Sequence, residues 1–452
     1  MKQNQFIDPL LHLLEIKSIS TQDEFLPQME EARHWLIDQL QSMGFKTRIL
    51  QGKRHAAVFA EREEDPKLPT VLIYGHYDVQ PPDPLNEWKT DPFVPIIKKG
   101  KIFARGATDD KGQFMIHIMA VKNLIEKNNG RLALNFKFII EGEEEIGSIS
   151  VEGLARKYAK NLFKADYLVV SDSEMVAPNQ PSIDISLRGI VYAEVFVESS
   201  KQDLHSGQFG GVAENPAVVL ARIISTLKDK NNKVNIPNFY ADVLPPTKEE
   251  LKDYNALKTT NAKIKKEGGM LSIGGGEEKY SLNERRWSRP TLDVNGIISG
   301  YIGEGSKTII PARASAKISM RLVPNQNPKL IWAEFEKFVK EISPNTVKVR
   351  VISHSDALPY KAPTTDPVFG LVKQSLKNAF GKAAVFQGVG GSIGFVPVVA
   401  KALNIPCILL GFGLPDENLH SPNEHFSIDN YLKGIEAMSD FYQKLGRDKT
   451  EP

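Results

Sequence analysis

The chain has 452 residues, more than a single hydrophobic core usually accommodates, and we therefore expect two domains. Its 57 lysines and arginines nearly balance its 55 aspartates and glutamates, so the net charge of +2 excludes a general attraction to nucleic acid or membrane surfaces. The single cysteine, Cys407, excludes an intramolecular disulfide and predicts a reducing, cytoplasmic environment.

The first part of the chain alternates between helix and strand patterns. The apolar run at 10–14 has polar flanks, so it predicts an amphipathic helix rather than a signal peptide. No apolar stretch approaches the ~20 residues that a membrane span requires. Further helices are predicted over 29–43 and 114–127, and strands over 70–74, 132–140, 167–170 and 407–410. This alternation predicts an α/β domain with a mostly parallel sheet.

The pattern changes near Arg188. Apolar and polar residues then alternate over 191–197 and 316–320, a helix is predicted over 217–228, and a polar segment rich in lysine and glycine covers 248–286. We therefore expect residues 188–355 to form an inserted α+β domain. The segments 1–187 and 356–452 would together form the α/β domain.

Five polar motifs lie where predicted strands end or where a helix begins. They are Gly75–Asp78, Arg105–Gly112, Glu141–Gly147, Ser171–Ser173 and Leu419–Glu424. Ligand sites in open α/β sheets lie beyond the carboxyl ends of the strands. The imidazole and carboxylate groups of these motifs suit Zn²⁺, Mn²⁺ or Co²⁺ and are enough for a pair of metal ions with a shared carboxylate.

Each motif also has a simpler explanation. Runs of acidic residues are usually solvated, and Asp109 and Asp110 could cap the helix that follows them. Their joint placement at strand ends favours a site, because buried acids and histidines are costly when they lack partners. The spacing also allows the Asp78 carboxylate to accept the N–H of His76, and Glu144 to take a proton from a metal-bound water.

Four of the motifs resemble those of the M20 metallopeptidase family, and within it the cytosolic non-specific dipeptidase and carnosinase branch. They are Gly-His-Tyr-Asp-Val-Gln-Pro at 75–81, Arg-Gly-Ala-Thr-Asp-Asp-Lys-Gly at 105–112, Glu-Gly-Glu-Glu-Glu-Ile-Gly at 141–147 and His-Ser-Pro-Asn-Glu at 420–424. The resemblance covers nearly the whole chain. It implies a zinc-peptidase-like catalytic domain with an inserted lid domain, a homodimer formed through the lid, and small peptides as substrates.

The resemblance also implies a role for each motif residue. The implied ligands of two divalent metal ions, zinc or manganese, are His76 and Asp172 for one ion, Glu145 and His420 for the other, and Asp109 for both. Asp78 would orient His76, and Glu144 would be the general base.

Four further residues would contact the substrate. His205 in the lid would polarise the substrate carbonyl from the partner subunit, and Arg321 would bind the terminal carboxylate. Gly391 and Ser392 would form the substrate loop. Close relatives carry Arg-Glu before this loop and proline after it, whereas this chain has Gly388-Val389 and Gly394-Phe395, which leaves the substrate preference open.

These features predict a dipeptidase in which Glu144 activates a water held between the two metal ions. An N-acyl-amino-acid deacylase of the same superfamily would share every metal ligand and is the main alternative. A non-catalytic binding protein on this fold is a more distant one, because a fold does not fix a function.

Overall fold

The computed structural model describes residues 4–448, and residues 1–3 and 449–452 of the expected catalytic domain lie outside the described residues. The chain divides into two compact units. Unit 1 consists of the segments up to Ile185, 362–387 and from Ile393 onward, and unit 2 consists of 186–361 and 388–392. The sequence-based boundaries did not assign the segment 388–392 to the inserted part.

Hydrogen bonds explain why this short segment lies with unit 2. The backbone N–H of Arg188 donates to the carbonyl oxygen of Gly391 at 3.0 Å, and the Ser392 hydroxyl donates to the carbonyl oxygen of Arg188. The segment is therefore tied to the start of unit 2 by both backbone and side chain.

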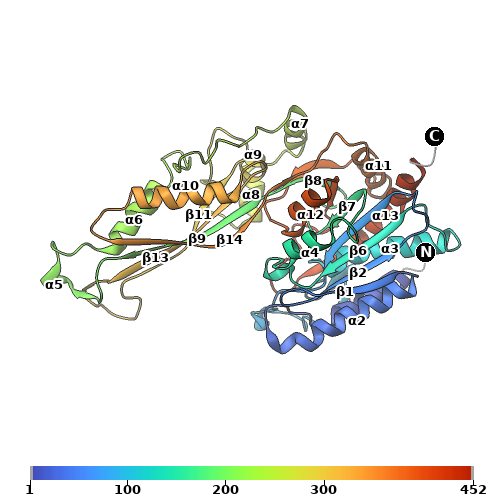
Figure 1. The fold of residues 1–452 in the computed structure, drawn as a ribbon, viewed down its shortest axis with the longest axis horizontal. Helices are drawn as coiled ribbons and strands as arrows, with labels where there is room; N and C mark the ends of the chain where they lie inside the picture. The colour runs from blue at the N-terminus through green and yellow to red at the C-terminus, as the bar shows by residue number, and fades with distance from the viewer. Residues whose placement is uncertain (1–3, 449–452) are drawn as a thin grey trace. The chain divides into compact units, whose positions relative to one another are not determined.

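Unit 1 is built around a mixed sheet with the strand order β1-β2-β6-β3-β7-β17-β8. Figure 1 labels β1, β2, β6, β7 and β8 of this sheet. Its strands are β1 (Lys46–Leu50), β2 (Ala57–Arg62), β3 (Thr70–His76), β6 (Asn135–Glu141), β7 (Tyr167–Ser171), β8 (Ser182–Leu187), β16 (Val385–Gly388) and β17 (Cys407–Leu410); β4 (Ile96–Lys98), β5 (Lys101–Phe103) and β18 (His425–Ser427) form a small separate sheet. The four central strands β6, β3, β7 and β17 are parallel, and the outer strands pair antiparallel. The sheet is therefore mixed rather than mostly parallel as predicted, because parallel pairing occupies only its centre and the outer strands pair antiparallel.

Helices cover both faces of this sheet. They are α1 (Asn4–Glu15), α2 (Leu26–Ser42), α3 (Lys111–Lys127), α4 (Val151–Tyr158), α11 (Val368–Phe380), α12 (Phe395–Leu403) and α13 (Ile428–Asp448). On β3, neighbouring residues point to opposite faces. The Tyr74 ring stacks on Phe395 of α12, whereas a Cβ at Gly75 would lie 2.4 Å from the Cβ of Phe114 in α3. Glycine at position 75 therefore allows α3 to approach the sheet closely.

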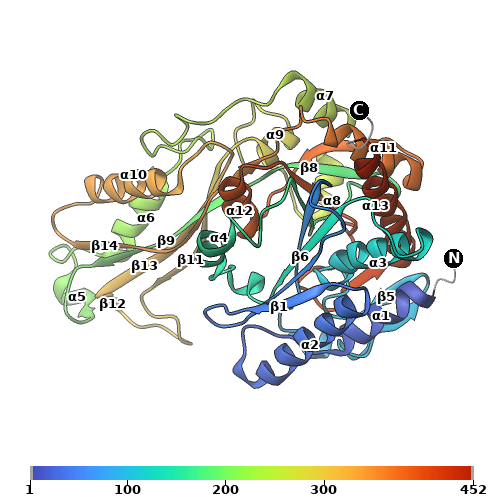
Figure 2. The same ribbon diagram turned by 45° about the vertical axis from the view of Figure 1, so that its right-hand side comes forward.

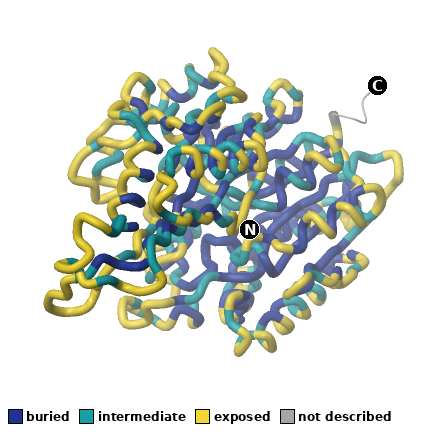
Figure 3. Tube along the Cα trace, turned by 60° about the vertical axis from the view of Figure 1, so that its left-hand side comes forward, coloured by how far each residue is buried: buried dark blue, intermediate teal, exposed yellow. Residues whose placement is uncertain are grey.

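The helices and strands predicted for unit 1 are all present, with shifted ends. The strand predicted from residue 132 begins at Asn135, and it is buried on both faces rather than alternating. The central strands β3 and β7 are likewise buried along nearly their whole length. Figure 3 marks such buried stretches of the chain in dark blue. Because helices cover both faces of the sheet, β6 has no solvent-exposed side on which polar residues would alternate with apolar ones.

Unit 2 contains a four-stranded antiparallel sheet with the order β11-β13-β9-β14. Its strands are β9 (Gly189–Glu198), β10 (Leu204–His205), β11 (Thr291–Ser299), β12 (Ile309–Ile310), β13 (Arg313–Leu322), β14 (Lys348–Ala357) and β15 (Tyr360–Lys361), and its helices are α5 (Ser206–Phe209), α6 (Pro216–Thr226), α7 (Lys248–Ala256), α8 (Asn261–Glu267), α9 (Leu282–Trp287) and α10 (Pro328–Glu341). Figure 2 shows α6 and α10 side by side along this sheet.

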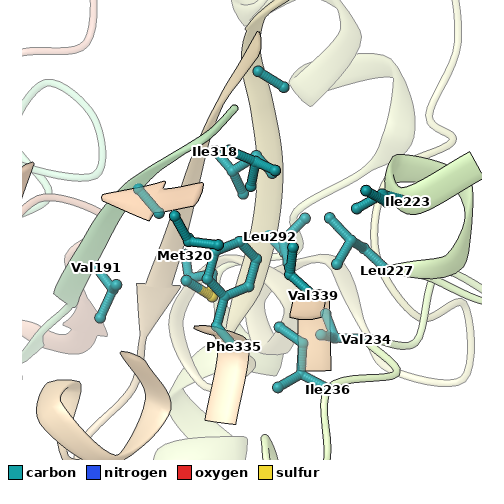
Figure 4. Packing of buried hydrophobic residues seen from close by; sticks show 14 of the residues in the cluster. Val191, Ile223, Leu227, Val234, Ile236, Leu292, Ile318, Met320, Phe335 and Val339 are labelled. Atoms are coloured by element: carbon teal, nitrogen blue, oxygen red, sulfur yellow. The ribbon is translucent and has the colours of Figure 1, made fainter. Parts of the chain in front are cut away.

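The core of unit 2 lies between this sheet and the two helices. Met320 of β13 and Leu292 of β11 point towards Phe335 and Val339 of α10 (Figure 4). Both helices begin with an asparagine cap followed by proline, and the Asn327 side chain accepts the N–H of Lys329 at the start of α10. The predicted α+β character of the insertion is thus present in unit 2.

Within residues 4–448, the structure contains no helix with the length and apolarity needed to cross a membrane.

Candidate metal centre

The parallel strands bring the predicted ligand motifs to one edge of the unit 1 sheet. His76 is the last residue of β3, Asp172 follows β7 directly, and His420 lies in the segment between β17 and β18. Glu145 belongs to a single 3₁₀ turn, Glu144–Ile146, shortly after β6. Because these strands run in the same direction, their carboxyl ends lie side by side, and residues far apart in the chain meet there.

Two groups of side chains could each hold a metal ion. His76, Asp109 and Asp172 form one group, and Asp109, Glu145 and His420 form the other. Asp109 belongs to both groups. Its Oδ1 lies 3.1 Å from Nε2 of His76, and its Oδ2 lies 2.8 Å from Nε2 of His420. One carboxylate thus faces both groups with different oxygens, which is the arrangement that a shared ligand requires.

The first group contains a buried nitrogen that lacks a hydrogen bond. Nε2 of His76 is buried and makes no hydrogen bond of normal geometry within the described residues, although Asp109 Oδ1 and Asp172 Oδ1 lie 3.1 and 3.9 Å away. Burial alone would lower the pKa of His76, but Asp109 and Asp172 raise it above its usual value. A buried imidazole nitrogen facing two carboxylates fits a divalent cation such as zinc, whose ligands are commonly these groups.

The electrostatics of the second group also favour a cation. Burial raises the pKa of Glu145 to about 8, and the charge of Asp109 contributes. In the first group, burial likewise raises the pKa of Asp172. Asp109 raises the pKa of His420 to about 9 against the opposing effect of burial. The carboxylates are crowded and desolvated, so positive charge beside them would relieve their repulsion.

Asp78 contacts His76 through a different atom from the one expected. Nδ1 of His76 lies 3.0 Å from the carbonyl oxygen of Asp78, whereas the carboxylate Oδ1 is 3.4 Å away. The carboxylate instead accepts the backbone N–H groups of Glu144 and Glu145, at 3.3 and 3.0 Å. Asp78 therefore ties the end of β3 to the turn that carries the two glutamates.

Glu424, for which no role was predicted from its sequence position, holds the segment that carries Asp109. Its carboxylate accepts the backbone N–H groups of Gly106, Thr108 and Asp109, at 2.9, 2.9 and 3.1 Å. It also pairs with Arg105 at 2.7 Å, and both side chains are almost fully buried, at 1% and 0% exposure. The only sequence signal was that Glu424 and Arg105 belong to motifs with a family resemblance.

Gln80 is a second residue that sequence reasoning missed. Its Nε2 donates to Oε2 of Glu145 at 2.7 Å. This carboxylate oxygen also faces His420, at 3.4 Å from its Nε2. Gln80 lies in the first motif, but an amide side chain gave no reason to expect a contact with an acid 65 residues further on.

The four predicted substrate residues belong to unit 2, and three of them are close together. Arg321 Nη1 donates to the Ser392 hydroxyl at 3.2 Å, and Gly391 is the neighbour of Ser392. His205 is exposed, and its Nδ1 accepts the N–H of Gly207. His205 sits apart from the other three, in the short β10–β12 ladder.

Solved structures of two proteins share this fold over nearly the whole chain. An M20 family metallo-carboxypeptidase from Sulfolobus solfataricus has a TM-score of 0.88 at 32% identity and covers 98% of this chain and 99% of its own. A dipeptidase from Saccharomyces cerevisiae has a TM-score of 0.83 at 28% identity and covers 98% and 96%. The predicted fold class, an α/β catalytic domain with an inserted α+β domain, is confirmed.

The sequence is also similar to characterised dipeptidases. The Cys-Gly metallodipeptidase of Candida albicans is 31% identical, and the match covers 98% of this chain and 95% of that protein. The human Beta-Ala-His dipeptidase is 29% identical, with coverage of 99% and 91%. The model of peptidase family M20/M25/M40 matches residues 72–444. The resemblance inferred from the motifs is therefore confirmed, and the chain is a metallopeptidase that belongs to peptidase family M20/M25/M40.

Proposed function

We propose that the protein is a dipeptidase that hydrolyses the peptide bond of dipeptides with a free terminal carboxylate, using two divalent metal ions. The observation that carries this proposal is the pair of ligand groups that share Asp109. His76 and Asp172 would hold one ion, and Glu145 and His420 the other. The relatives named above as dipeptidases match nearly the whole chain, which supports dipeptides as the substrate class.

When bound, the two ions would polarise the scissile carbonyl and make water more acidic. Glu144 would then take the proton from the attacking water and pass it to the leaving amine. Burial raises the pKa of the Glu144 carboxyl well above its usual value, and the charges of Asp172 and Glu145 raise it further. Glu144 thus lies beside the proposed ligands Asp172 and Glu145, where its carboxylate could reach a water held between the ions.

Metal removal should lower the thermal stability of the protein, because it leaves the crowded carboxylates without positive charge. Two molar equivalents of Zn²⁺ or Mn²⁺ per subunit should restore the original unfolding temperature, since a ligand that binds only the folded state stabilises it. Elemental analysis combined with a thermal melt measures both quantities. Saturation of the melting temperature at one equivalent would contradict the shared role of Asp109. Zinc is our proposal, because histidine and carboxylate ligands suit it.

Substrates with a free C-terminal carboxylate should be hydrolysed fastest, because the Arg321 guanidinium can bind that group. Amidated dipeptides should be cleaved at least ten times more slowly than free ones, and the Arg321→Gln variant should lose most of this difference. The measurement is kcat/KM for Ala-Ala and Ala-Ala amide. Equal rates for the two substrates in the wild-type protein would remove Arg321 from carboxylate binding.

Two other activities can be distinguished from dipeptide hydrolysis by a comparison of substrates. The similar protein from Sulfolobus solfataricus is named a metallo-carboxypeptidase, so removal of the last residue from longer peptides is a second candidate. An N-acyl-amino-acid deacylase would use the same metal ligands. Comparing Ala-Ala with Ala-Ala-Ala and N-acetyl-alanine distinguishes them, and we expect Ala-Ala to react fastest.

The geometry of unit 2 supports a homodimer with shared active sites. The ladder that carries His205 adjoins the Arg313 end of β13, because Ala312 bonds to both Ser199 and Asp203. Arg321 lies eight residues further along this strand, a distance of roughly 26 Å for extended backbone. Two extended residues span about 7 Å. One dipeptide cannot reach both side chains of one chain, so a partner subunit would supply His205.

A mixed dimer tests this arrangement. One chain carries His205→Ala and the other carries Glu144→Gln, and two distinct affinity tags isolate the mixed species. If sites are shared, the His205→Ala chain keeps Glu144 and receives His205 from its partner, so one of two sites is complete. Activity should reach about half that of the wild-type dimer. Activity no higher than that of the parent variants would show that His205 serves only its own chain.

A further inference from the structure

Unit 2 contains a cavity of about 470 Å³ whose lining is rich in arginine. Arg188 precedes β9, Arg286 lies in α9, and Arg321 is near the end of β13. Trp287 and Tyr240 contribute aromatic surface. The volume is large enough for an amino-acid residue of a ligand.

Two further arginines in the lining already have partners. Arg289 pairs with Glu277 at 2.6 Å and lies over the Tyr240 ring. Arg285 donates to three backbone carbonyl groups, those of Tyr280, Gly275 and Glu278. These two side chains therefore hold the wall of the cavity in place.

Arg188 differs, because part of its guanidinium is buried without a partner. The residue is 6% exposed, and its Nη2 donates to the carbonyl oxygens of Arg285 and Arg289 at 2.7 and 2.8 Å. Its Nε has no hydrogen bond within residues 4–448. Burial lowers its pKa to about 10, and the charge of Arg321 contributes. A largely buried guanidinium without an anionic partner is costly, so a carboxylate beside it in the cavity would be stabilising.

Acidic groups do not neutralise the cluster of Arg188, Arg286 and Arg321. None of the three has a carboxylate within ion-pair distance in the described part of the chain. The acid that acts on this cluster is Asp293, which is 62% exposed and already faces Lys228 at 3.8 Å. One α-carboxylate on Arg321 would leave most of the positive charge unbalanced.

We propose that this cavity binds the C-terminal residue of the substrate when that residue carries a second carboxylate, as aspartate and glutamate do. Arg321 takes the α-carboxylate, and Arg188 with Arg286 takes the side-chain carboxylate. The inference rests on the proposed dipeptidase function, and it adds a substrate class to it. A dicarboxylic residue balances two of the three guanidinium charges in the cavity lining.

The test compares Ala-Glu with Ala-Gln, which differ only in the side-chain charge. The wild-type protein should prefer Ala-Glu by about tenfold or more in kcat/KM. Arg286 is exposed, so Arg286→Gln should fold normally, and it should reduce the preference by about tenfold. The matched control is Arg222→Gln on α6, whose side chain is 72% exposed and does not line the cavity. It should leave both rates unchanged.

A binding measurement separates failure of this inference from failure of the proposed function. Calorimetry on the metal-loaded protein compares free glutamate, free glutamine and inorganic phosphate as probes. We expect glutamate to bind at least ten times more tightly than the other two. Hydrolysis of Ala-Gln as fast as Ala-Glu, or equal binding of glutamate and glutamine, overturns the inference and leaves the dipeptidase in place. Tighter binding of phosphate also overturns it. Absence of any dipeptide hydrolysis overturns the proposed function.

Discussion

Replacing Glu144 with glutamine should reduce kcat by about 10²-fold or more while leaving metal binding intact. The amide has nearly the same shape as the carboxylate but cannot accept a proton at neutral pH. Asp78 holds the turn through backbone N–H groups, which the substitution does not remove. The measurement is steady-state kinetics on a dipeptide, together with elemental analysis of the same preparation.

The matched control for this prediction is Glu152→Gln, an exposed residue of α4 in the same unit. It makes the same chemical change away from the ligand groups and should behave like the wild-type protein. If Glu144→Gln keeps two metal ions and stays within a few-fold of wild-type kcat, then Glu144 is not the base.

Replacing Glu424 with alanine should destabilise unit 1 by about 3–5 kcal/mol, because it leaves the buried Arg105 guanidinium without its partner. The N–H groups of Gly106, Thr108 and Asp109 would lose their acceptor at the same time. Urea denaturation of the metal-free protein measures the loss without a contribution from bound ions. Hydrogen exchange localises it, since these three amides should exchange much faster.

Two further variants distinguish the specific role of Glu424 from a general loss of folding. Glu424→Gln keeps one acceptor oxygen and should lose less stability than Glu424→Ala. The control Glu341→Ala removes a carboxylate that is 56% exposed and 3.9 Å from Lys337. Exposed pairs contribute little, so its unfolding free energy should change by about 0.5 kcal/mol or less. Normal exchange of the 106–109 amides in Glu424→Ala would contradict the role of Glu424.

The grouping of four of the five ligand candidates could be predicted because each of them comes after a recognisable strand pattern. A short apolar run followed by a histidine or an acid is enough to predict such a strand end. Parallel strands then place their carboxyl ends at the same edge of the sheet. Asp109 is the exception, because it precedes a helix, and its sequence position also allowed a capping role. The structure brings it between the two histidines.

The support around these residues could not be predicted, because it depends on contacts between distant parts of the chain. Glu424 and Thr108 are separated by 316 residues, and no local spacing encodes such a contact. The nearer acceptor for His76, a backbone carbonyl, could not be predicted for a different reason, although the Asp78 carboxylate also lies 3.4 Å away. A backbone carbonyl competes with the carboxylate of the same residue, and only the structure shows that Glu144 and Glu145 occupy the latter.

The polar segment 248–286 contained signals that the sequence analysis did not use. Thr247 and Glu250 form a capping box at the start of α7, and Ser281 and Glu284 form another at the start of α9. A search for apolar periodicity alone misses such short helices, because few of their residues are buried. The cavity that contains Arg286 and Trp287 is therefore built from a region that hydropathy would describe as a loop.

The strand order of unit 1 also constrains when the enzyme becomes functional during synthesis. β17 comes late in the chain, yet it pairs with β7 on one side and with β8 on the other, in the middle of the sheet. During synthesis, the ligand residues from His76 to Asp172 emerge from the ribosome first. The gap between β7 and β8 cannot be filled until β17 has emerged. The nascent chain therefore exposes unpaired strand edges over a long interval, which favours slow folding and a need for chaperones. His420 follows β17, so a nascent chain can complete the metal centre only after the segment that carries this histidine has been made.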